Sequence, residues 1–214
     1  MEISQPTNTT TESFINLAIN IIDNGFSKKI KRNIWENSKW KHIADLENDD
    51  VGKVGEEIIN TFCQMAGIDS NIDGSKTKEI GGGYGDGNIN KKTVEIKTAR
   101  LGCDETSFQH ELGEMPWKPE YMIFLDIAPD KMYITIFPNF SQEFYIMSGQ
   151  DSKNKCSPYF NTKSITWRKQ KGAFKLDTTI NINEKNIGNY SFKIYNDLND
   201  FTKFKDFVNS IIPI

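Results

Sequence analysis

Apolar residues recur along this chain at two spacings, one typical of helices and the other typical of strands. From Val51 to Met65 and from Leu198 to Ile211 they return every three or four residues, which predicts amphipathic helices over roughly residues 48–65 and 197–212. Gly67 follows the first of these segments and is a suitable helix stop. The buried stripe expected of that helix consists of Val51, Val54, Ile58, Phe62 and Met65.

Three other segments have the pattern of strands. Residues 93–97 alternate polar and apolar side chains, and residues 121–127 form a short apolar run. Residues 131–137 alternate again after a turn at residues 128–130. Residues 108–114 are expected to form a helix or an irregular turn. Helices, then strands, then a terminal helix predict an α/β fold with a mixed β-sheet flanked by helices.

The length and charge of the chain restrict its class. Its 214 residues predict a single domain, with an N-terminal helical part over residues 12–46 and a core over residues 48–137. A region rich in turn residues and lysine, residues 150–190, precedes the terminal helix over residues 197–212. The net charge of −3 argues against a protein that coats nucleic acid regardless of sequence, because such proteins are usually strongly basic.

The sequence also predicts a compartment. No apolar run approaches the roughly 18 residues that a membrane span needs. The first residues lack the basic and apolar regions of a signal peptide. Cys63, Cys103 and Cys156 are scattered, without the spacing of a metal site or a disulfide framework. We therefore expect a cytoplasmic protein that has no membrane partner.

Residues 85–97 carry the candidate chemistry. Glu95 and Lys97 share one face of the predicted strand, because side chains alternate along a strand. If Asn90 and the residue after it form a tight hairpin turn, Asp86 lies directly opposite Glu95, with Cβ atoms roughly 4.5–5.5 Å apart. Two carboxylates in that position repel each other unless a cation lies between them. The pattern therefore predicts a metal site.

The residue types of this segment fit one kind of metal chemistry. Asp86 and Glu95 are hard oxygen ligands suited to Mg²⁺, with Mn²⁺ as a substitute, and the carbonyl of Ile96 is placed to join them. A metal ion there lowers the pKa of a bound water and stabilises charge on a phosphoryl oxygen. Lys97 on the same face can orient that water and stabilise the developing charge. Together these groups suit hydrolysis of a phosphodiester.

The same residues carry a resemblance to a known family. Gly85-Asp86, followed by Val94-Glu95-Ile96-Lys97, resembles the motif of the PD-(D/E)xK nuclease superfamily. That superfamily includes most type II restriction endonucleases, Holliday-junction resolvases and several repair nucleases. The resemblance implies a restriction-endonuclease-like mixed sheet with the two acids and the lysine on a central hairpin. Gly85 stands where the family often has proline.

The resemblance implies roles for further residues. Family members often place a glutamate near the start of the preceding helix, so Glu56 is expected to complete the metal shell directly or through water. Glu57 is the alternative, because both acids lie off the apolar stripe, and both also fit solvent-facing acids near a helix N-terminus. A basic segment is expected to contact DNA, although a solvated face is the alternative reading. The expected DNA contacts are Arg168, Lys169, Lys171 and Lys175, together with Arg100.

The expected function is hydrolysis of double-stranded DNA by a Mg²⁺-dependent endonuclease, most like a type II restriction enzyme. A palindromic target calls for a homodimer, and a restriction role calls for a cognate DNA methyltransferase. A structure-specific repair or recombination nuclease and a catalytically inactive nucleic-acid-binding module are the alternatives. His42 and His110 lack the spacing of a two-histidine site, and Asp126 is read as a strand-end residue.

Overall fold

The structure is a computed structural model of the 214-residue chain. The chain divides into two compact units, residues 1–34 and residues 35–214, and the elements given below all belong to the second. Of the predicted N-terminal helical part, residues 12–32 lie outside the described residues, and the described remainder contains the 3₁₀ helix η1 (Lys41–Asp45). The structure describes residues 33–73, 83–102, 107–113, 117–140, 146–148, 153–155, 165–168, 173–195 and 200–214.

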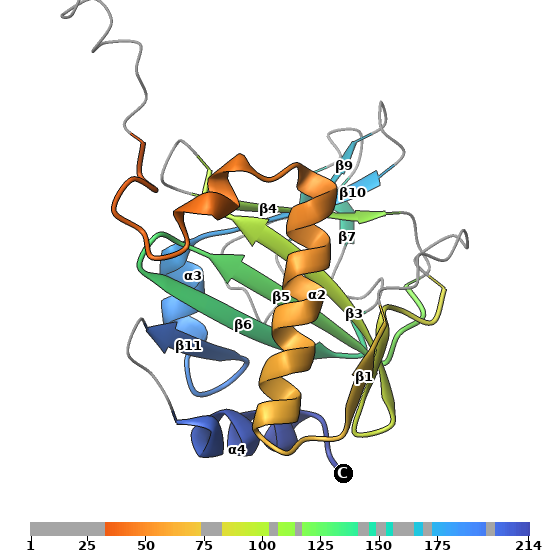
Figure 1. Ribbon diagram of the computed structural model, residues 1–214. Coiled ribbons are helices and arrows are strands. Elements are labelled where there is room, and N and C mark those ends of the chain that lie inside the picture. Colours follow the sequence, from red (N-terminus) through yellow and green to blue (C-terminus); the bar gives the residue numbers. More distant parts are fainter. Residues whose placement is uncertain are drawn as a thin grey trace, which may run out of the picture. The chain divides into compact units, whose positions relative to one another are not determined.

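The larger sheet has six strands in the order β1-β2-β3-β5-β6-β11 (Figure 1). β3 and β5 run parallel, and the other neighbouring pairs are antiparallel. The predicted mixed sheet flanked by helices is therefore confirmed, in a mainly antiparallel form. The strands are β1 (Ser70–Ile72), β2 (Gly87–Ile89), β3 (Lys92–Arg100), β5 (Tyr121–Ile127), β6 (Lys131–Pro138) and β11 (Ser191–Tyr195).

A second sheet has five strands in the order β4-β10-β9-β8-β7. The expectation of a helix or irregular turn over residues 108–114 is wrong, because this segment contains strand β4 (Phe108–Gly113). Its burial alternates strictly, and His110 occupies a buried position between Phe108 and Leu112. The remaining strands are β7 (Ile146–Ser148), β8 (Lys153–Lys155), β9 (Ile165–Arg168) and β10 (Ala173–Thr178).

Three α-helices accompany the sheets in the described residues: α2 (Asn48–Met65), α3 (Ile180–Asn186) and α4 (Phe201–Ile211). The bounds predicted for the first are confirmed. None of the described helices is long and apolar enough to cross a membrane.

The buried face of α2 differs from the expected stripe. Its buried residues are spaced by four, and Met65 is 62% exposed. The reason is close packing, because a Cβ on Gly55 would lie 1.8 Å from Oγ1 of Thr98 on β3. Phe62 lies on a second, half-buried face and meets Phe201 and Phe204 of α4 edge to face. The buried line of α2 is Val51, Gly55, Ile59 and Cys63.

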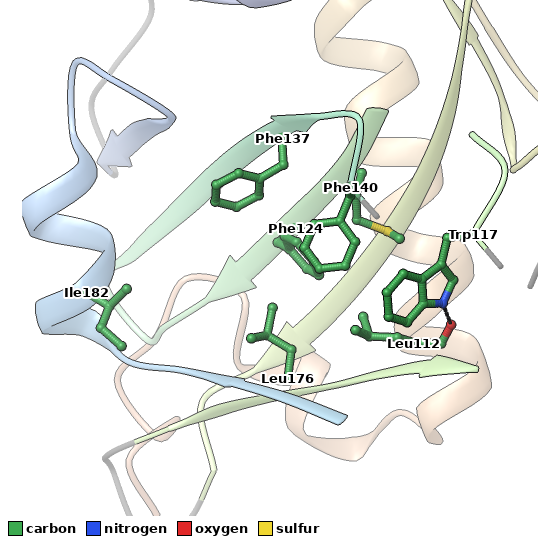
Figure 2. Packing of buried hydrophobic residues seen from close by; sticks show 8 residues of the cluster. Leu112, Trp117, Phe124, Phe137, Phe140, Leu176 and Ile182 are labelled. Carbon is green, nitrogen blue, oxygen red and sulfur yellow. Dashed lines mark hydrogen bonds between the residues drawn. The ribbon is translucent and has the colours of Figure 1, made fainter. Parts of the chain in front are cut away.

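The hydrophobic core joins the two sheets (Figure 2). Phe124 of β5 and Phe137 of β6 come from the larger sheet, whereas Leu112 of β4 comes from the smaller one. Trp117 is buried beside them and donates its indole N–H to the carbonyl of Leu112 at 2.8 Å. Each such side chain contributes about 1.5–3 kcal/mol on burial. Helix α2 packs against one face of the larger sheet, where Gly55 meets Thr98. The hydrophobic core lies against the other face.

Candidate active site

The hairpin of β2 and β3 carries the predicted site. Asn90 and Lys91 form its two-residue turn with φ angles of 50° and 64°, the left-handed values that a tight hairpin of this kind requires. The side-chain amide of Asn90 donates to Oδ1 of Asn209 at 3.0 Å and to the carbonyl of Ile212 at 2.8 Å. The predicted turn is therefore confirmed, and the C-terminal helix region anchors it.

Asp86 lies one residue before β2, where the regular pairing with β3 ends. Gly87 pairs with Val94, and the N–H of Asp86 donates to the carbonyl of that same Val94 at 2.8 Å. The carboxylate of Asp86 reaches further along β3, where its Oδ2 accepts the N–H of Ile96 at 2.7 Å. Asp86 thus contacts both neighbours of Glu95, through its backbone on one side and its side chain on the other.

Glu95 is the buried acid of the site, at 5% exposure. Its Oε1 accepts a hydrogen bond from Nζ of Lys97, whose side chain is 26% exposed. Its Oε2 is buried and has no hydrogen-bond partner among the described residues. A buried carboxylate oxygen without a donor is costly, on the order of 1–3 kcal/mol or more. The structure therefore brings Asp86, Glu95 and Lys97 together and leaves one acceptor unsatisfied.

The two carboxylates disfavour each other's charge. Burial raises the pKa of Glu95, and the charge of Asp86 adds to the rise while Lys97 opposes it. Burial also raises the pKa of Asp86, although the Ile96 N–H and the charge of Lys97 oppose that rise. A cation would favour the ionised form of both groups, and Oε2 of Glu95 would be available to bind it. The residues present therefore fit the predicted divalent metal.

Gly85 departs from the family motif for a steric reason. Its φ is +94°, and a Cβ there would lie 2.2 Å from the carbonyl oxygen of Val94. Proline is locked near a φ of −65°, so it cannot adopt this conformation. The glycine lets the chain approach β3 closely, just before Asp86.

The helix acids differ in exposure. Glu56 is half-buried, whereas Glu57 is exposed, and both follow the glycine that packs against β3. Within the described part of the chain, no three His, Cys, Asp or Glu side chains are grouped closely enough to hold a metal ion. The contribution of Glu56, or of Glu57, to a metal shell stays a prediction.

Asp73 is an acid near the site that the sequence pattern did not single out. Its N–H donates to the carbonyl of Asp86 at 3.2 Å, which continues the antiparallel pairing of β1 with β2. Its charge adds to the rise in the pKa of Asp86. No local pattern identifies it, because residues 74–82 separate it from the hairpin and only strand pairing brings it there.

The predicted DNA contacts fall in several settings. Lys175 is 4% exposed and its Nζ lies 3.1 Å from Oδ1 of Asp177, so a DNA contact would require it to leave that partner. Arg100 is half-buried and donates to the carbonyls of Ile43 and of Leu46, the latter at 2.8 Å. Arg168 is in β9, where the structure describes the backbone only, and Lys169 and Lys171 lie outside the described residues. These contacts stay predictions.

His110 and Asp126 form a second buried polar group. Nε2 of His110 lies 2.6 Å from Oδ1 of Asp126, and both residues are 1% exposed. Oδ2 of Asp126 accepts from Oγ1 of Thr178 at 2.7 Å and from Nδ2 of Asn183 at 2.6 Å. The four residues come from β4, β5, β10 and α3, so this group ties the two sheets together.

The hairpin thus presents two repelling carboxylates, one lysine and one unsatisfied oxygen on a strand anchored at its turn. The second polar group, by contrast, connects structural elements. Comparison of the chain with protein-family models, with curated proteins and with solved structures finds no match.

Proposed function

We propose that this chain is a divalent-metal-dependent DNA endonuclease, and specifically a type II restriction enzyme that uses Mg²⁺. The observation that carries the proposal is the carboxylate of Glu95, which is buried next to Asp86 with one oxygen on Lys97 and the other without a partner in the part of the chain that the structure describes. An arrangement of this kind costs stability in the metal-free protein. Its chemical use is to receive a cation.

The residues of the hairpin have two proposed roles, which are metal binding and stabilisation of negative charge. Asp86, Glu95 and the carbonyl of Ile96 would hold Mg²⁺. Helix α2 packs on the Thr98 face of β3 and Glu95 alternates to the other face, so Glu56 is not assigned to this shell. When bound, the metal supplies a water of lowered pKa and stabilises negative charge on a phosphoryl oxygen. Lys97 already donates to Glu95, so its ammonium lies beside the metal ligands and stabilises the charge that develops during attack.

The environment of the hairpin supports this division. Asp86 is fixed by hydrogen bonds to Val94 and Ile96, so its carboxylate does not need to reorganise when a metal binds. The turn is anchored through Asn90 to the end of the chain. A site held by paired strands and anchored turns suits catalysis that depends on fixed charges.

A structure-specific repair or recombination nuclease is the second candidate. Tyr84, two residues before Asp86, is 70% exposed, and an exposed aromatic ring beside a scissile bond suits DNA with an unpaired nucleotide. Both candidates share the same metal chemistry and differ in the DNA that they select.

Incubation of the purified protein with phage DNA and Mg²⁺ tests the proposal. We expect discrete fragments from the parent protein, and none from Glu95→Gln or Asp86→Asn. A smear of products would favour a non-specific enzyme. Absence of cleavage with Mg²⁺ and with Mn²⁺, in protein that is folded by circular dichroism, would refute the enzymatic proposal.

Glu56 and Glu57 form a matched pair of neighbouring acids for a second arm of the experiment. If Glu56 completes the shell, Glu56→Gln weakens activation by Mg²⁺ and Glu57→Gln leaves it unchanged. The reverse result would assign the supporting role to Glu57. Titration of activity against Mg²⁺ concentration measures both effects, because loss of a ligand shifts the concentration required for half-maximal activity.

A further inference from the structure

An exposed tyrosine lies at the entrance to the hairpin. Tyr84 is 70% exposed, and Gly83 and Gly85 on either side of it have φ angles of +61° and +94°. The glycine on its C-terminal side is confined between the Val94 carbonyl and the Pro119 ring, where a Cβ would lie 2.2 Å and 3.0 Å from them. Tyr84 therefore projects from a backbone that is fixed against the strand of Glu95.

A lysine covers one face of this ring. Nζ of Lys118 lies over the ring of Tyr84, 5.6 Å from its centroid, which is within the range of a cation–π interaction. Lys118 precedes the proline that contacts Gly85, so the two segments lie side by side. Tyr84 is 70% exposed with the ammonium over its ring, so a flat partner can reach the ring from solvent.

The position of the ring connects it with the chemistry. Tyr84 is two residues from Asp86, so their Cα atoms are at most about 7 Å apart. That distance corresponds to one nucleotide along an extended strand, because adjacent phosphates are separated by a similar length. A DNA strand whose phosphate is at the carboxylates therefore brings a neighbouring nucleotide to the ring of Tyr84.

We propose that Tyr84, backed by Lys118, stacks on an unpaired nucleotide next to the scissile phosphodiester. This inference rests on the metal-dependent nuclease function that both candidates share, and the DNA that it names is the substrate of the second candidate, the structure-specific nuclease. In an intact duplex the faces of the bases are covered by their neighbours, so a stacking ring needs a base that is single-stranded or has left the stack.

The chain offers a matched control for this residue. Tyr195 is 53% exposed at the end of edge strand β11, and Nζ of Lys193 lies 4.6 Å from its ring centroid. The same pair of residue types is thus present on the strand at the opposite edge of the sheet from the hairpin. A general affinity of exposed tyrosine and lysine for DNA would affect both positions equally.

The test is fluorescence anisotropy with three labelled DNAs in the presence of EDTA: a single strand, a duplex with one unpaired nucleotide, and a fully paired duplex. We expect Tyr84→Ala to weaken binding of the first two by about ten-fold, with little change for the paired duplex. Tyr84→Phe and Tyr84→Trp keep the parent affinity, because stacking needs only the ring. Tyr195→Ala binds all three DNAs like the parent.

The outcomes separate this inference from the proposed function. If Tyr84→Ala binds all three DNAs like the parent, or loses affinity equally for all three, the stacking inference is wrong while metal-dependent cleavage stands. An equal loss in Tyr195→Ala also overturns it. A parent protein that binds none of these DNAs and leaves phage DNA uncut with Mg²⁺ and with Mn²⁺ refutes both. Since Tyr84 is exposed, circular dichroism of the variants confirms that they remain folded.

Discussion

Two buried carboxylates in this molecule have opposite surroundings. Glu95 has one oxygen bonded to Lys97 and the other without a partner among the residues whose positions are described, and burial together with the neighbouring Asp86 raises its pKa. Asp126 is equally buried, but both of its oxygens accept hydrogen bonds. The partners of Asp126 are His110, Thr178 and Asn183.

The difference separates a structural acid, Asp126, from the acid for which we propose a function, Glu95. A buried carboxylate with both oxygens hydrogen-bonded rigidifies the fold, here by joining the strands of two sheets. A buried carboxylate with an unfilled acceptor lowers stability, and such groups concentrate where a ligand or a reaction needs them. Burial of an acid alone therefore does not indicate a ligand site. A buried carboxylate oxygen that lacks a hydrogen-bond donor and lies beside a second acid does indicate one.

Removing the satisfied acid should have the largest effect. Asp126→Ala leaves His110, Thr178 and Asn183 buried without their common acceptor. We expect the free energy of unfolding to fall by about 3–5 kcal/mol, as when one partner of a buried charged network is removed. Urea denaturation measures the loss, with exposed Glu57→Ala as the control. A loss below about 1 kcal/mol would contradict the structural role.

Removing the partner of the unsatisfied acid should act on catalysis. Lys97→Met withdraws the ammonium to which we assign charge stabilisation, and under the proposed function we expect cleavage to slow by about 10²–10³-fold. Lys92→Met is the control, because Lys92 lies on the same strand and pairs with the exposed Glu120. Rates are compared per folded molecule. Equal rates for the two variants would remove Lys97 from the mechanism.

Asn90 shares a feature with each of the two acids. Its side-chain amide is hydrogen-bonded, as Asp126 is, and it holds the turn of the hairpin that carries Glu95. Asn90→Ala removes the amide that bonds Asn209 and Ile212 and places alanine at a φ of 50°. We expect a loss of about 2 kcal/mol in unfolding free energy. Asn90→Gly tolerates the φ and isolates the contribution of the amide. Thermal unfolding of both variants measures how much of the loss comes from backbone strain and how much from the lost amide hydrogen bonds. Equal stability of the parent and Asn90→Gly would show that the amide contributes nothing.

The smallest expected effect is the pH dependence of stability that Glu95 causes. Because the folded-state pKa of Glu95 is raised, its ionisation opposes folding: the penalty is absent below its ordinary pKa near 4.5 and grows as pH rises through the folded pKa. Glu95→Gln should therefore unfold at a higher temperature than the parent at pH 8 and at the same temperature at pH 4. The neutral amide removes the penalty, because it carries no charge to bury.

Glu120 supplies the control of opposite sign. The Thr93 N–H and the side chains of Lys92 and Thr93 hold its pKa below the ordinary value. Its ionised form therefore favours folding above that value, and Glu120→Gln should lower the melting temperature at pH 8. If Glu95→Gln also lowered it, the unsatisfied oxygen would not be a source of instability.

The sequence predicted the parts of this site that local pattern determines. Alternation over residues 93–97 and a polar pair at Asn90 and Lys91 were sufficient for the hairpin, because a two-residue turn sets the pairing of its strands. Strands β5 and β6 followed from apolar runs bounded by turn residues. All of these depend on neighbours within about ten residues.

The sequence failed where burial depends on distant partners. In β4 the buried position between Phe108 and Leu112 holds His110, whose burial is supported by Asp126 sixteen residues later. Without that partner, the segment shows apolar residues four apart and resembles a helix. Asp73 was missed for the same reason, since only the pairing of β1 with β2 places it beside Asp86.

The buried face of α2 was misjudged because large apolar residues were expected to mark it. Instead the helix approaches β3 through Gly55, and the larger Val54 and Ile58 remain half-buried. Hydrophobicity scales give glycine little weight, so the closest contact of the helix had no signal in the apolar pattern.

That contact constrains the order in which this sequence can change. A Cβ at position 55 would lie 1.8 Å from Oγ1 and 2.7 Å from Cβ of Thr98, so alanine fits there only after position 98 has become glycine. Thr98 can lose its hydroxyl without breaking a hydrogen bond among the described residues, because its Oγ1 has none. Divergence at these positions is therefore directional: the strand must lose its side chain before the helix gains one, and intermediates in the reverse order would push α2 away from β3.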